Sequence, residues 1–384
     1  MIHRLLQIDC LEGFCLKKVW ITIYKWFVIS IILQLVLLAY IDVRILGSNP
    51  SVLTSAEFER DNGSDKDDNE EDTIGIEISD DARNIKFSYD LSFLAYMIED
   101  VLIIREASGN RLVRKISPFD EESDKTLDMS PGKISHFTWM EDRNIFIYAS
   151  SIEGQNYDEI EVRTIDFELE EDHIYENRMS GLQKGSKLRS LEVTYLTNML
   201  YSQVLTDTNE RLYAYDIMGN LSFVRVMPRG SKIRDTRYYD SVFIDENNGR
   251  IQIYDGLKKT TRTLELEGSA VLLDVDRNDS VYIGMMDDDG MIESIKTGQV
   301  QRAQVQDWET IELDDSVMKA QIMIDFDGNM YINDMKKRRL TQISEEGRIL
   351  DYEGMIIEIR QEYVITRNNG FLEINDFMND TSEL

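Results

Sequence analysis

The feature that most constrains the fold of this chain is a hairpin pattern that recurs seven times along its last three-quarters. Each copy has an apolar strand, a polar turn of Asn, Asp or Gly, and a second strand with alternating apolar residues. The copies begin at Leu94, Ile147, Leu205, Ile244, Ile283, Ile332 and Ile365. Short strands with regularly spaced turns are typical of all-β repeat folds. The pattern therefore predicts an all-β domain over residues 73–384.

A further apolar strand stands ahead of each hairpin, as in "KISHFTW" and "KIRDTRYY". Each unit then holds four strands in about 40 residues, which is the make-up of a β-propeller blade. We therefore expect a seven-bladed β-propeller. Six or eight blades would also fit, because the second unit is long and divergent.

The two ends of the repeat region predict how the ring closes. The last unit stops near Phe377 without a fourth strand, and "TIGIEIS" at 73–79 is a spare alternating strand before the first full unit. Pairing the two would complete the last blade and remove an exposed sheet edge.

The sixth unit, "DFDGNMYINDMKKRRLTQISEEGRIL", resembles the NHL type of propeller repeat. The matching residues are Asp325, Asp327, Gly328, Asn329, Tyr331, Ile332, Asp334, Arg339, Leu340 and Gly347. Residues 274–284 are a weaker copy, and the first unit resembles a TolB or WD40 blade. The resemblance implies a propeller over about 73–384 and leaves the function open, since propellers carry many unrelated activities.

Asp325 and Asp327 alternate as they would in a calcium loop. The glycine-dependent turn that follows explains the same residues without a metal. We therefore predict no metal site and no cofactor.

The N-terminal part predicts a membrane anchor. Residues 19–41, "VWITIYKWFVISIILQLVLLAYI", carry one charge, Lys25, and are long enough to cross a bilayer as a helix. Cations precede the span, which places residues 1–18 in the cytoplasm and the rest outside. A buried core helix and a cleaved signal peptide are the alternatives, although no small-residue cleavage site follows the segment. Residues 42–72 are polar and acidic and read as a flexible linker.

The amino-acid composition limits the kinds of ligand that the protein can bind. The chain has 72 acidic and 42 basic residues and a net charge of −30, which argues against nucleic acid as a ligand. Both cysteines, Cys10 and Cys15, precede the span, so disulfides cannot stabilise the outer part. The absence of cysteine after the predicted span suggests a membrane-anchored bacterial protein.

One pair of short motifs stands out as a candidate site. "GSKLR" at 185–189 and "GSKIR" at 230–234 open successive units, and "PGKIS" at 131–135 opens the one before. We expect their cations to gather at one mouth of the central channel as a basic socket for a carboxylate, phosphate or acidic glycan. The socket residues are Lys133, Lys187, Arg189, Lys232, Arg234 and Arg237. The alternative is that these are solvated turns whose cations pair with neighbouring carboxylates.

Catalytic signatures are absent from the sequence. It holds no G-x-S-x-G, no H-E-x-x-H and no glycine-rich phosphate loop, and His136 lies in a predicted strand. We expect a binding or scaffold module for a protein or an anionic glycan of the cell envelope. A propeller hydrolase or lyase acting on carbohydrate or peptide is the alternative, and a structural subunit of an envelope complex is a third.

Overall fold

The computed structural model describes most of the repeat region. The described residues are 74–108, 111–118, 132–194, 196–301, 303–344, 347–360 and 363–376, with the single residues 26, 30, 31 and 34. The predicted tail, anchor and linker therefore lie outside the described residues, apart from those four. Within the part that is described, no helix is both long and apolar enough to cross a membrane.

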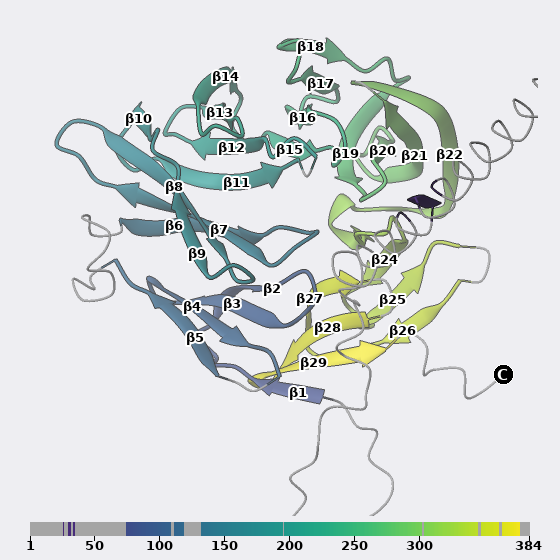
Figure 1. Cartoon of the computed structure of the whole chain (residues 1–384). Helices are drawn as coiled ribbons and strands as arrows, with labels where there is room; N and C mark the ends of the chain where they lie inside the picture. The colour runs from purple at the N-terminus through teal and green to yellow at the C-terminus, as the bar shows by residue number, and fades with distance from the viewer. Residues whose placement is uncertain are drawn as a thin grey trace, which may run out of the picture. The chain divides into compact units, whose positions relative to one another are not determined.

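The described residues between 74 and 376 form seven antiparallel sheets arranged as the blades of a β-propeller (Figure 1). Each blade begins with its innermost strand, because that strand contacts the first strand of the next blade: β2 contacts β6, and β6 contacts β11. The contacts continue from β11 to β15, β19 and β23, and from β27 to β2. The predicted all-β class and the count of seven blades are confirmed.

The strands of the first four blades are as follows. Blade 1 has β2 (Arg83–Phe87), β3 (Phe93–Ile98), β4 (Val101–Glu106) and β5 (Leu112–Ile116). Blade 2 has β6 (Lys133–Trp139), β7 (Ile145–Ile152), β8 (Asp158–Asp166), β9 (Glu171–Ile174) and β10 (Met179–Leu182). Blade 3 has β11 (Lys187–Val193), β12 (Leu200–Leu205), β13 (Glu210–Tyr215) and β14 (Leu221–Met227). Blade 4 has β15 (Lys232–Asp235), β16 (Ser241–Asp245), β17 (Ile251–Asp255) and β18 (Thr260–Thr263).

The remaining blades complete the ring. Blade 5 has β19 (Ser269–Val275), β20 (Ser280–Met286), β21 (Ile292–Gln301) and β22 (Gln304–Val317). The short 3₁₀ helix η2 (Lys319–Gln321) leads into blade 6, which has β23 (Ile322–Ile324), β24 (Met330–Asp334), β25 (Arg339–Gln342) and β26 (Ile349–Asp351). Blade 7 has β27 (Met355–Arg360), β28 (Tyr363–Asn368), β29 (Phe371–Asp376) and, as its outermost strand, β1 (Ile74–Glu77).

The ring closes as the sequence predicts. Strand β1 pairs with β29 in antiparallel register, with Ile76 opposite Leu372, and the two lie side by side in Figure 1. The N-terminal strand thus becomes the fourth strand of the last blade. Both Ile76 and Leu372 are buried, so closure also buries apolar side chains.

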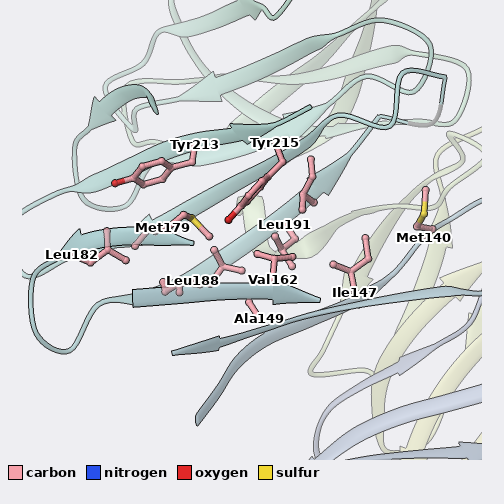
Figure 2. Packing of buried hydrophobic residues seen from close by; sticks show 13 residues of the cluster. Met140, Ile147, Ala149, Val162, Met179, Leu182, Leu188, Leu191, Tyr213 and Tyr215 are labelled. Atoms are coloured by element: carbon pink, nitrogen blue, oxygen red, sulfur yellow. The ribbon is translucent and has the colours of Figure 1, made fainter. Parts of the chain in front are cut away.

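The core lies between the faces of neighbouring blades. Figure 2 shows Val162, Met179 and Leu182 of blade 2 packed with Leu188 and Leu191 of blade 3. Alternate residues of a strand point to opposite faces, so each blade presents one apolar set to each neighbour. This arrangement requires the alternating pattern seen in the repeats.

The turn before β24 explains the residues that also suit a calcium loop. Asp325 Oδ1 accepts hydrogen bonds from the backbone N–H of Asp327 (2.9 Å) and Asn329 (2.8 Å). Its Oδ2 accepts from Asn329 Nδ2 and from the Tyr331 hydroxyl. Asp276 holds the equivalent turn of blade 5 with the same two kinds of bond. Asp325 and Asp276 are therefore turn-forming residues, whereas the Asp327 carboxylate pairs with Arg277 (2.6 Å).

Candidate functional site

Cations stand at, or just before, the start of the innermost strand in five of the seven blades. Lys133, Lys187 and Lys232 are the first residues of β6, β11 and β15. Arg83 is the first residue of β2, and Lys319 lies in η2 immediately before β23. Because the blades repeat the same strand order around one axis, these starts lie at the same mouth of the channel. We call Arg83, Lys133, Lys187, Lys232 and Lys319 the cation ring.

The glycine and serine of the two repeated motifs have a structural role. Gly185 and Gly230 have φ angles of 79° and 92°, which favour glycine. The Ser186 hydroxyl donates to the Gln183 carbonyl oxygen (2.6 Å), and the Ser231 hydroxyl donates to that of Pro228 (2.8 Å). Each Gly-Ser pair therefore closes the same tight turn before an innermost strand.

A buried carboxylate of the preceding blade anchors each of these turns. Gly185 donates its backbone N–H to Asp158 Oδ2 (2.6 Å), and Gly230 donates to Glu210 Oε1 (3.0 Å). Asp158 and Glu210 are equivalent, since each is the first residue of the third strand of its blade. The motif is thus a contact between blades, and its lysine side chains remain exposed.

A cavity of about 410 Å³ joins three members of the cation ring. Its walls include Arg83, Lys133 and Lys187. The acidic residues Glu99, Asp100, Glu153 and Asp158 also line it. Lys133 Nζ lies 2.9 Å from Asp100 Oδ1. This part of the mouth therefore carries both positive and negative side chains.

Lys232 and Lys319 form a second part of the mouth. Lys319 Nζ donates to the Leu272 carbonyl oxygen (2.6 Å) and lies 3.7 Å from Asp245 Oδ2. Burial, together with the charge of Lys232, lowers the pKa of Lys319 to about 8. Two amino groups in such proximity repel one another, and an anion between them would relieve that repulsion.

The three arginines of the predicted socket have carboxylate partners. Arg189 forms an ion pair with Glu210, whose side chain is fully buried. Arg234 bridges two blades, with Nε 2.8 Å from Asp274 Oδ1 and Nη1 3.3 Å from Glu192 Oε1. These pairs neutralise both guanidinium groups locally and leave less charge for a ligand.

Arg237 lies at the opposite end of the channel from the cation ring. It follows the end of β15, whereas Lys232 begins that strand. Arg237 pairs with Asp235 (2.6 Å) and with Glu141. The structure therefore brings Lys133 and Lys187 together in one cavity and places Arg237 elsewhere. Ligand binding by any of the six residues stays a prediction.

The channel between the two ends holds further buried charges. Burial lowers the pKa of Lys86, although the charges of Glu192 and Glu358 act in the opposite direction. Burial also raises the pKa of Glu192, against the effect of Arg234. Lys86 Nζ donates to Thr138 Oγ1 over 3.3 Å. These groups belong to several blades, and their opposite charges partly neutralise one another around the axis.

His136 is a neutral residue of the channel wall. Burial, and then the charge of Lys86, lowers the pKa of His136 to about 3. An imidazole held neutral in this way cannot act as a cation in the mouth at neutral pH. A buried, neutral imidazole of this kind suits a structural role in the wall.

Two members of the cation ring were missed by the sequence interpretation. Arg83 and Lys319 lie outside any Gly-Ser-Lys motif. Their position in the sequence could have identified them. Arg83 opens "RNIKF" and Lys319 opens "KAQIMI", and each stretch contains the apolar strand that begins a unit.

Comparison with known proteins supports no family assignment. No family model and no curated protein matches the sequence. Solved structures with a similar fold include virginiamycin B lyase from Staphylococcus aureus, with 10% identity over 79% of this chain and 98% of that chain and a TM-score of 0.47. U3-55K has 10% identity over the same shares and a TM-score of 0.45. Hsv2 of Kluyvelomyces marxianus has 12% identity over 75% of this chain and 88% of that chain, with a TM-score of 0.43.

Proposed function

We propose that the propeller is a binding module that holds an anionic group of an envelope ligand at the cation ring. The observation that carries this proposal is the recurrence of a cation at, or just before, the start of the innermost strand in five blades, in a chain of net charge −30. An acidic glycan is the ligand to test first, and an acidic protein surface is the other.

We also propose that the module acts outside the membrane, attached through residues 19–41. The support is the hydrophobic sequence of that segment and the cations that precede it. Tethering to a surface would raise the effective concentration of a weak binding site near envelope ligands. Protease treatment of intact cells, followed by detection of residues 74–376, tests the topology. Protection of this region from external protease would contradict an outward-facing propeller.

The binding test uses the two exposed lysines of the repeated motifs. Lys187→Gln combined with Lys232→Gln removes two charges from the mouth and leaves the arginine ion pairs intact. Heparin should raise the Tm of the unaltered protein, and this shift should shrink by at least half in the double variant. The shift should also fall as salt is added, because exposed charges are screened.

A matched control is available on the opposite side of the propeller. Lys258 and Lys259 are exposed in the connection between β17 and β18, which faces away from the cation ring. Lys258→Gln with Lys259→Gln makes the same change in net charge. This control should keep the full heparin shift. An equal loss in both double variants would mean that net charge alone, and not the mouth, determines binding.

A further inference from the structure

Blade 2 is the one described blade in which two strands share the fourth position. β8 pairs with β9 through residues 163–166 and with β10 through Ile160 and Asp158. The chain crosses between them through residues 175–178. A cavity of about 780 Å³ lies at this split edge, and we call it the blade 2 rim pocket. Volumes in this range accommodate small organic ligands.

Two guanidinium groups share one buried carboxylate in the rim pocket. Glu161 Oε1 accepts from Arg163 Nε (2.5 Å), and its Oε2 accepts from Arg178 Nη2 (2.6 Å) and Nε (2.9 Å). The side chains of Glu161 and Arg163 are only 3% and 8% exposed. Both carboxylate oxygens of Glu161 are therefore occupied by the two arginines.

Arg163 retains donors that the protein does not use. A guanidinium has five N–H groups. Those of Arg163 bond Glu161 and the Tyr148 hydroxyl, and its remaining N–H groups have no partner among the described residues. Arg163 lines the rim pocket, so a ligand in the pocket could reach these donors. An anionic acceptor in the pocket would form charge-assisted hydrogen bonds with these donors.

Part of the wall is apolar. Ile174, Tyr175 and Leu221 line the pocket. The Tyr175 ring packs on Tyr215 with 5.0 Å between centroids, which fixes its position. Its hydroxyl makes no hydrogen bond to any residue that the structure describes. The pocket therefore offers an apolar surface beside cationic donors.

Acidic residues limit the charge that the pocket can accept. Glu159 and Glu176 also line it, and Glu159 Oε2 lies 3.5 Å from Arg178 Nη1. They would repel a dianion such as phosphate more strongly than a monoanion. We propose that the rim pocket binds a small organic monocarboxylate with an apolar body, whose carboxylate accepts from Arg163. This site is separate from the cation ring and does not depend on the function proposed for it.

Calorimetry on the full-length protein in detergent tests this proposal with three isosteric probes. 3-Phenylpropionate should bind saturably, with a Kd of ~1 mM or tighter. 3-Phenylpropanol, which lacks the charge, should bind at least ten times more weakly. 3-Phenylpropylamine should give no saturable heat. Equal or tighter binding of the amine, or no saturable binding of the carboxylate, would overturn the proposal.

Variants locate the binding without disturbing the buried ion pairs. Ser180 is an exposed lining residue on β10, and Ser180→Trp should block the pocket and weaken binding more than tenfold. Tyr175→Phe keeps the packed ring and should weaken binding roughly 2- to 10-fold through the lost hydroxyl. Thr261→Trp, on the exposed outer strand β18, should change nothing. Unchanged binding by Ser180→Trp would place the ligand elsewhere and refute the assignment.

Discussion

Arg367 donates a hydrogen bond from Nη2 to the carbonyl oxygen of Asp80 over 2.7 Å. The same guanidinium also reaches the carbonyl oxygens of Ser79 (3.0 Å) and Ala82 (2.8 Å). Arg367 belongs to β28 of the last blade, whereas its acceptors form the connection from β1 to blade 1. One side chain thus fixes the segment at which the ring closes, in addition to the β1–β29 ladder.

Arg367→Met should lower the free energy of unfolding by about 1–2 kcal/mol, because the three carbonyl groups lose a charged donor. The urea midpoint measures this loss. Arg262, an exposed residue on β18, provides the control, since Arg262→Met should change the free energy by less than about 0.5 kcal/mol. Equal midpoints for the two variants would show that the β1–β29 ladder alone secures the closure.

Glu210→Ala should lower the free energy of unfolding far more than the loss of an exposed carboxylate does. Glu210 is fully buried and accepts from Arg189, Gln203 and the backbone of Gly230. Its removal leaves Arg189 and the turn of blade 4 without their acceptor, so we expect a cost of about 3–5 kcal/mol. Glu265→Ala, at an exposed site, should be nearly neutral in the same denaturation experiment. A similarly small effect at Glu210 would contradict its role as an anchor between blades.

His136 should make the protein less stable in acid. Its pKa falls from 6.5 to about 3 on folding, so the unfolded chain binds more protons between these pH values. The contribution of His136 to the free energy of unfolding therefore rises with pH between about 3 and 6.5. His136→Gln should reduce the slope of stability against pH in this window. The control is His173→Gln, at an exposed position on β9. An unchanged slope at His136 would show that the imidazole is protonated in the folded protein.

The architecture could be predicted because the fold repeats and the pattern repeats with it. The missing fourth strand after Phe371–Asp376 and the spare strand at Ile74–Glu77 together specified the closure. Local turn chemistry was also readable, since an aspartate such as Asp325 bonds backbone groups two and four residues ahead.

The candidate sites could be predicted only in part, because they depend on where strands end and on distant partners. "IRDTRYY" gives no sign that β15 stops at Asp235, so Arg237 could not be assigned to the opposite end of the channel. Arg234 pairs with Glu192 and Asp274. These two carboxylates lie about 40 residues before and after it in the sequence, and they belong to other blades. The rim pocket depends on the division between β9 and β10, which in the sequence is only a long, irregular unit.

Pairing of β1 with β29 has a consequence for the order in which the protein can mature. Strand β1 is the first of the described strands to be synthesised, and its partner β29 is the last of them. Until β29 has been synthesised, β1 must stay unpaired and must not pair with an exposed sheet edge of another molecule. Such a long-range contact forms late and slowly compared with the hairpins inside each blade. Nascent chains held close together would therefore be most exposed to strand exchange between molecules at this one step.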